Sequence, residues 1–361
     1  MTAIQETAHE SEHAQDHHHD HPAWLAHHFD DAEQQFDAGK LGMWLFLVTE
    51  VLFFSGMFCA YSLYRNRDPQ VFEFCSRFLN EKLGAINTGV LLFSSLTMAW
   101  AVRAAQLKQH KLLVGMLGAT LGCAAIFLGV KAVEYSHKWE LGLLPGKFYV
   151  SQVPGAAHGD HGYLGSLCVV PLILTIIAAV YYVYSIATMS KFHQQVAGPV
   201  FVAGLCFFGG VQLGRTLEAE ETTHHAAEHA AHEHTPGASH DHSQDHSAGE
   251  LLPEKEGGEV VALGHKSIED VKVMQEELTT PDASVNQKSM AGLFFSIYYC
   301  MTGVHAVHII GGMLVITWLI IKAAREEFHD QYFGPVDNVG LYWHLVDFIW
   351  IYLFPLLYLI K

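Results

Sequence analysis

Ionisable side chains stand inside apolar stretches of this sequence, where each of them costs free energy. The stretch "LGMWLFLVTEVLFFSGMF", Leu41 to Phe58, holds a single carboxylate, Glu50, about nine residues from its start. A charged group near the centre of a bilayer is costly and usually faces a partner, water or a functional site. Because burial disfavours the charged form of a carboxyl group, we expect Glu50 to be neutral or to be stabilised by a partner.

Two further apolar stretches each place an imidazole three residues before another polar group. In "YYCMTGVHAVHIIGGM", His305 and His308 share one helix face, and in "LYWHLVDFIWIYLFP", His344 and Asp347 do the same. The aromatic residues that lie seven apart on roughly that second face are Trp343 and Trp350. Several acid and imidazole groups are therefore expected at depth in the membrane.

A third group of charges lies toward the end of the stretch "FLGVKAVEYSHKWE". Lys131 and Glu134 are three residues apart, as are Glu134 and His137, so each pair shares a helix face. We expect here a local ion pair near the membrane interface.

Three explanations of these buried groups are open. Paired histidines with a carboxylate can bind zinc, copper or iron. The same groups could form a proton or ion path through a helix bundle. They could also be structural, hydrogen-bonding to one another and to lipid so that the bundle docks against a larger partner. Spacing alone favours the structural explanation, because one histidine pair is thin evidence for a metal.

The elements that carry these residues are membrane-spanning helices. Half of the 361 residues are apolar although the formal net charge is −17, so charge and apolar character are segregated along the chain. A span needs about 20 residues, and in lipid such a run must be helical because every backbone group has to be paired internally. The sequence predicts an all-α bundle of about seven transmembrane helices: Leu41–Tyr64, Gly84–Leu107, Leu112–Tyr135, Leu164–Ile186, Val196–Leu213, Met290–Ile321 and Val339–Ile360.

The fifth predicted span is short and rich in residues that disfavour helices. A re-entrant or interfacial hairpin is the alternative for this segment. The residues that raise this alternative are Gly198, Pro199, Gly204, Gly209 and Gly210.

Two hydrophilic segments, residues 1–38 and 215–289, hold most of the remaining charge. Both are acidic and rich in histidine, a composition that cannot bury enough apolar surface to offset chain entropy, so we expect flexible tails. The part "AAEHAAHEH" could form a transient helix. The histidines of the second segment that could bind copper or zinc weakly, without a fixed geometry, are His224, His225, His229, His232 and His234.

Five ordered motifs resemble subunit III of haem–copper respiratory oxidases of the cytochrome c oxidase type. They are "FLVTEVLFFSGMF", "NTGVLLFSSLTMAWAVRAA", "FLGVKAVEY", "MTGVHAVHIIGG" and "YWHLVDFIWIYLFPLLYL". The resemblance covers roughly Gly39–Leu141 and Met290–Lys361. It implies a five-helix core, residues 39–142 and 290–361, into which a helix pair, residues 143–214, and the second His-rich segment are inserted.

The resemblance also implies roles for single residues. Glu50 falls on the family's buried membrane glutamate, His305 and His308 on its paired histidines, and Glu134 on the glutamate of A-x-E-Y. These four residues are expected to be buried polar groups near bound lipid, with His308 as the candidate partner of Glu50. The terminal motif, expected to serve packing between helices or subunits, contributes Tyr342, Trp343, His344, Asp347 and Trp350.

The function implied by the resemblance is that of a noncatalytic subunit beside a catalytic one. Such a subunit holds phospholipid in a cleft between two helix groups and supports proton uptake and sustained turnover during oxygen reduction. Haem and copper would belong to partner subunits I and II, and this chain would bind no cofactor except lipid. We expect other respiratory subunits as further partners and no nucleic acid. The alternatives are the matching subunit of a quinol oxidase or nitric oxide reductase and, from another class, a His-rich metal-ion transporter.

The numbers of Lys and Arg residues in the loops on the two sides are nearly equal, so the positive-inside rule does not orient the chain. The orientation is instead taken from the resemblance. The family places the amino terminus in the cytoplasm and the carboxy terminus outside, in a bacterial plasma membrane. An insertion within the core must then cross the membrane an even number of times, which favours the fifth span. Imidazoles mixed with carboxylates on the cytoplasmic side could collect protons near neutral pH. The expected proton-collecting residues are His17, His18, His19 and His110.

Overall fold

The computed structural model describes residues 29–146, 162–233 and 285–359. These residues form α1 (Ala32–Arg67), α2 (Pro69–Ser76), α3 (Glu81–Gln106), α4 (His110–Glu140), α5 (Tyr163–Ala187), α6 (Lys191–Glu233), α8 (Val285–Ala324), α9 (Gly334–Phe354) and the π-helical turn η2 (Pro355–Leu359). Seven of the helices, all but α2 and η2, are long and apolar enough to cross a membrane. The predicted polytopic all-α bundle is confirmed.

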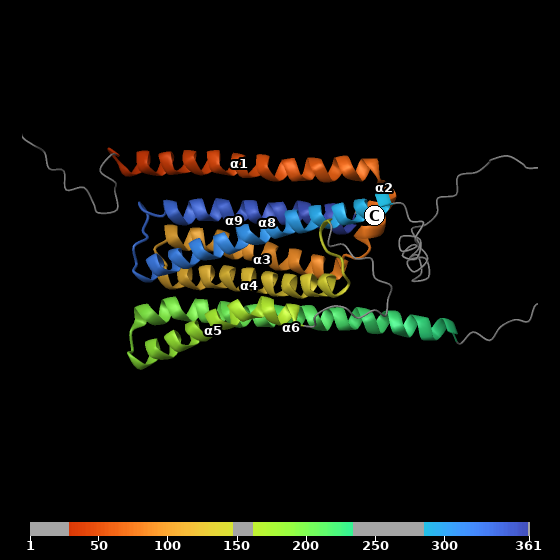
Figure 1. Ribbon diagram of the computed structural model, residues 1–361. Helices are drawn as coiled ribbons and strands as arrows, with labels where there is room; N and C mark the ends of the chain where they lie inside the picture. The colour runs from red at the N-terminus through yellow and green to blue at the C-terminus, as the bar shows by residue number, and fades with distance from the viewer. Residues whose placement is uncertain (1–28, 147–161, 234–284, 360–361) are drawn as a thin grey trace, which may run out of the picture.

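The helices lie in layers, with α1 along one edge and the α5–α6 pair along the other (Figure 1). Between them stand α8, α9, α3 and α4, of which α4 is the most enclosed: two thirds of its span is buried, against 6% for α5. The first helix packs on α9 and α8, whereas α6 packs on α4. The inserted pair therefore covers one face of the core and turns its own outer face to lipid.

Glycines join α6 to α4, which explains the composition of the fifth span. A Cβ atom on Gly210 would lie 2.4 Å from the carbonyl oxygen of Ile126, and one on Gly129 would lie 2.2 Å from that of Phe207. Such contacts let two helix backbones approach closely, which is how helices associate where lipid removes the hydrophobic driving force. The hairpin alternative is wrong: these residues lie in a continuous helix, and Pro199, Gly204 and Gly210 form close contacts with α4 or α5.

Parts of both hydrophilic segments that were expected to be flexible are helical. Helix α1 begins at Ala32, inside the expected amino-terminal tail, with the Asp31 side chain accepting a hydrogen bond from the Gln34 backbone N–H at 2.7 Å. Helix α6 continues to Glu233, through most of "AAEHAAHEH", and α8 begins at Val285. The segment expected to be flexible from residue 215 is thus helical for its first 19 residues. The short helix α2 was not predicted; it starts with Pro69, whose fixed φ suits a first helical position.

Three side-chain contacts show that the start of α1 and the three connections α3–α4, α5–α6 and α8–α9 lie at one end of the bundle. Lys40 of α1 lies 3.3 Å from Asp337 of α9, and Lys108 in the α3–α4 turn lies 3.0 Å from Asp330 in the α8–α9 turn. Arg325, after α8, stacks over the Phe192 ring at the start of α6. Each turn is short, so successive helices run antiparallel and place their polar groups at matching depths.

Candidate functional site

Glu50 and His308 meet at the middle of their helices. Glu50 lies 18 residues after the first residue of α1 and 17 before its last. Nε2 of His308 on α8 lies 3.0 Å from Oε2 of Glu50, and the two side chains are 20% and 17% exposed. The predicted partnership is confirmed, and it answers why a carboxylate stands in an apolar helix.

The hydrogen bonds of His308 define where a proton is held. Nδ1 of His308 lies 2.8 Å from the carbonyl oxygen of Val304, which can only accept, so Nδ1 carries a hydrogen. In the neutral imidazole Nε2 is then an acceptor, and Glu50 must donate to it as a carboxylic acid. If the proton moves to Nε2 instead, the pair becomes an imidazolium and a carboxylate. Either way the pair holds one proton and is neutral overall.

Tyr342 supports this pair from α9. Its hydroxyl donates to the carbonyl oxygen of His308 at 2.8 Å, and its ring lies 6.0 Å from that of Phe46 on α1. The Phe54 ring packs edge-on against the His308 imidazole at 5.3 Å. Three helices therefore fix the orientation of the His308 ring.

His305 does not join His308, although sequence spacing puts them on one face. Its side chain is fully buried, stacks on the Trp350 indole at 5.4 Å between ring centroids, and packs edge-on against Phe127. Neither ring nitrogen has a hydrogen-bond partner among the described residues. His305 and His308 thus have different surroundings and do not converge on a common ligand.

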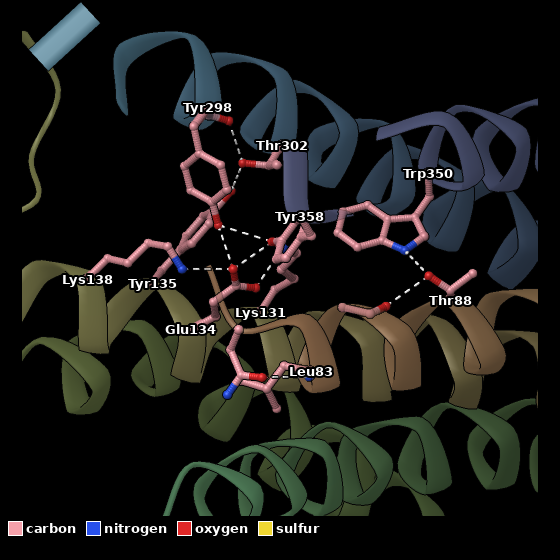
Figure 2. A network of polar contacts seen from close by, with 12 residues as sticks. Leu83, Thr88, Lys131, Glu134, Tyr135, Lys138, Tyr298, Thr302, Trp350 and Tyr358 are labelled. Atoms are coloured by element: carbon pink, nitrogen blue, oxygen red, sulfur yellow. Dashed lines mark hydrogen bonds and ion pairs between the residues drawn. The ribbon is translucent and has the colours of Figure 1, made fainter. Parts of the chain in front are cut away.

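Glu134 is the centre of a second buried network (Figure 2). It lies 24 residues after the first residue of α4, toward the end of that helix that is remote from the α3–α4 turn. Its Oε2 accepts from Lys131 at 2.7 Å, and its Oε1 accepts from Lys138 at 2.8 Å, Tyr298 at 2.8 Å and Tyr358 at 2.6 Å. One carboxylate therefore joins α4, α8 and η2. A buried carboxylate is stable when its remaining acceptor positions are satisfied in this way.

The predicted ion pair between Lys131 and Glu134 is confirmed, and it is buried within the protein. Lys131 and Glu134 are 5% and 2% exposed, and the Lys131 ammonium lies 4.5 Å from the centre of the Trp350 ring. His137 shares a helix face with Glu134 but pairs with Glu218 on α6. Lys138 was missed, although its position four residues after Glu134 is a sequence signal. Tyr298 and Tyr358 had no such signal, because both come from distant segments.

The terminal-motif residues line the contact between α9 and α3. The Trp343 indole donates to Ser94 at 3.0 Å, and Nδ1 of His344 lies 2.6 Å from the Ser95 hydroxyl. Asp347 is buried, with Oδ2 3.5 Å from the same Ser94 hydroxyl. One turn further, Trp350 donates to Thr88 at 3.0 Å. These contacts agree with the expected packing role within the chain.

Some predicted site residues cannot be placed. His17, His18, His19 and His234 lie outside the described residues, and for the four histidines from His224 to His232 only the helical backbone is described. His110 begins α4, and its Nδ1 is buried without a hydrogen-bond partner among the described residues. Within residues 29–146, 162–233 and 285–359 no group of three or more potential ligands could hold a metal ion.

The geometry defines a class of protein: a polytopic helical membrane protein whose buried acidic and basic groups hydrogen-bond to one another across helices. The comparison with protein families narrows this class. The family described as cytochrome c oxidase subunit III matches residues 281–361, so the chain carries a subunit III domain in its carboxy-terminal region. This region contains His305, His308 and the terminal motif.

Curated relatives match the chain over a similar length. A heme-copper oxidase subunit I+III of Aeropyrum pernix is 39% identical over 71 residues, which are 19% of this chain and 9% of that protein. A probable cytochrome c oxidase subunit 3 of Nocardia farcinica is 35% identical over 66 residues, 18% of this chain and 32% of the relative. The cytochrome c oxidase subunit 3 of Thermostichus vulcanus is 39% identical over 69 residues, which are 19% of this chain and 34% of that relative. The chain thus matches at most about a third of these relatives' length. No solved structure matches it.

Proposed function

We propose that this chain is a noncatalytic subunit III of a proton-pumping haem–copper terminal oxidase of the cytochrome c oxidase type. It packs on the catalytic subunit, holds phospholipid in a cleft between helix groups, and supports proton uptake and sustained turnover during oxygen reduction. Haem and copper belong to the partner subunits I and II.

One observation carries this proposal beyond the matched region. The polar groups of the carboxy-terminal domain find their partners on the three helices that precede the insertion: His308 on Glu50, Asp347 on Ser94, and Tyr358 on Glu134. Each partner lies in a motif that resembles subunit III although no family match covers it. The two separated parts of the resemblance therefore form one polar framework, as a single five-helix core requires.

Proton uptake at the end with the short turns is supported by its charged groups. Asp330 is exposed there, 3.0 Å from the Lys108 ammonium. His329 neighbours Asp330, and His110 begins α4 at the same end. Carboxylates and imidazoles mixed in this way can bind and exchange protons. In the proposed orientation, with the amino terminus in the cytoplasm of a bacterium, this end faces the proton source.

The deciding experiment is purification from native membranes in a detergent that keeps complexes intact. The proposal expects a large partner with haem absorbance to co-purify with the chain. A haem-containing complex that oxidises quinol or reduces nitric oxide would instead support the alternatives within the superfamily. A colourless, metal-loaded chain without partners would support a His-rich metal-ion transporter and contradict the proposal.

A further inference from the structure

The Glu50–His308 pair leaves one oxygen unused. Oε2 of Glu50 contacts His308, whereas Oε1 has no hydrogen-bond partner among the described residues and is not sealed inside the protein. Whether the shared proton is on Glu50 or on His308, Oε1 is an acceptor. A ligand that completes the pair must therefore bring a hydrogen-bond donor.

The position of this oxygen restricts where the donor comes from. Glu50 lies at the midpoint of a 36-residue helix, so a lipid head group at the membrane surface is about 15 Å away, half the thickness of the hydrocarbon core. Water is scarce at this depth, and an acceptor without a donor is costly there. The donor is expected on a molecule that dissolves within the hydrocarbon.

Two exposed phenylalanines share the helix surface with Glu50. Phe46 lies four residues before Glu50 and Phe53 three residues after it, so both side chains neighbour Glu50 on the helix surface. Phe46 contacts the Tyr342 ring and Phe53 the Phe54 ring, but they are 41% and 51% exposed, so each keeps an outer surface that can pack against a flat ligand. A few polar atoms among apolar and aromatic side chains are typical of sites for small organic ligands.

We propose that Glu50 Oε1, Phe46 and Phe53 form a binding site for a quinol, a planar ring that carries hydroxyl groups on an apolar tail. One ring hydroxyl donates to Oε1, the ring packs against the two phenylalanines, and the tail stays in the hydrocarbon. The oxidised quinone has carbonyl oxygens in place of the hydroxyls, so it cannot make the hydrogen bond. Binding alone is proposed, with no electron transfer. It does not depend on the proposed function, because the site lies within this chain.

The test uses the full-length chain in phospholipid nanodiscs under anaerobic conditions. Discs are equilibrated with decylubiquinol or decylubiquinone, isolated, and the retained ligand is quantified by chromatography after subtraction of empty discs. We expect the quinol to bind about 2- to 10-fold more tightly than the quinone, the factor that one neutral hydrogen bond supplies. Equal retention of the two forms, or no retention above empty discs, would overturn the proposal, and this contrast needs no variant.

Variants locate the site. The side-chain amide of Glu50→Gln has an oxygen that can accept from the quinol and an NH2 group that can donate to His308, so quinol retention should not change. Glu50→Leu has neither group and should lower retention by the same factor of about 2 to 10. Phe53→Leu should also lower it. Phe93→Leu is the matched control, since Phe93 is a comparably exposed ring on α3. Thermal unfolding of each variant separates lost binding from lost folding. Equal effects of Phe53→Leu and Phe93→Leu would contradict the assigned position.

Discussion

Nε2 of His308 lies 3.0 Å from Oε2 of Glu50, across 258 positions of sequence. This contact ties α1 to α8, and α1 is only 11% buried along its span. The pair is held by a hydrogen bond between the imidazole and the carboxyl group. Its removal should loosen the lipid-facing side of the bundle and leave the rest of the core intact.

Replacing Glu50 by Ala should accordingly leave the haem spectrum and initial turnover of the proposed complex nearly unchanged. Bound lipid should decrease, and the number of turnovers before activity fades should fall, because α1 loses its polar contact with α8. Oxygen consumption over time and the lipid content of the purified complex measure both effects. Immediate loss of the initial rate in an assembled complex would mean that Glu50 belongs to an obligatory proton path.

Replacing Glu134 by Gln should destabilise the protein strongly. Two buried ammonium groups, Lys131 and Lys138, would lose their only carboxylate among the described residues, and breaking a buried pair in this way costs about 3–5 kcal/mol. Thermal unfolding in detergent measures the loss. Glu140→Gln is the control, because Glu140 is exposed on the same helix. A similar midpoint for both variants would contradict the role assigned to Glu134.

Two adjacent glycines of α6 should respond to alanine with opposite signs. A Cβ at residue 210 meets the backbone of α4, so Gly210→Ala should destabilise by about 1–3 kcal/mol through overpacking. A Cβ at residue 209 meets nothing within 4 Å, so Gly209→Ala should stabilise by up to about 1 kcal/mol, the difference in helix propensity. Thermal midpoints decide, and destabilisation by both changes would argue against the α4–α6 contact.

The α5–α6 turn holds Met189 in a left-handed conformation, with φ of 51°. The side chain is 84% exposed and makes little packing, so Met189→Gly should relieve the backbone and stabilise by about 1 kcal/mol. The neighbouring Thr188 has an ordinary φ of −84°, and Thr188→Gly should destabilise instead. Equal shifts of the unfolding midpoint in the same direction would contradict the turn geometry.

Sidedness can be tested with cysteines at opposite ends of the bundle. In a background without reactive native cysteines, Met189→Cys should react with a membrane-impermeant maleimide only from the cytoplasm, and Asn66→Cys only from outside. Both positions are exposed and lie outside the apolar part of their helices. Labelling of both from one face would contradict the seven-span arrangement.

The sequence by itself determined the helices and the buried polar residues. Runs of about 20 apolar residues admit only helices in lipid, and an ionisable residue such as Glu50 within them demands a partner. The choice of His308 as that partner came from the family resemblance, and the contact itself is a finding of the structure. These features follow from composition and local periodicity, which a single segment displays by itself.

Only the tertiary structure decided which buried groups meet and how deeply. His305 and His308 share a helix face, yet one stacks on Trp350 and the other pairs with Glu50, because different helices cover the two positions. Glu134 gained Tyr298 and Tyr358 as partners from segments more than 160 residues away. Gly210 was among the residues that suggested a weak span, yet it forms a close contact with α4, because a residue without a side chain lets another backbone approach. Contacts of this kind depend on how helices pack in three dimensions, which the spacing within one helix does not contain.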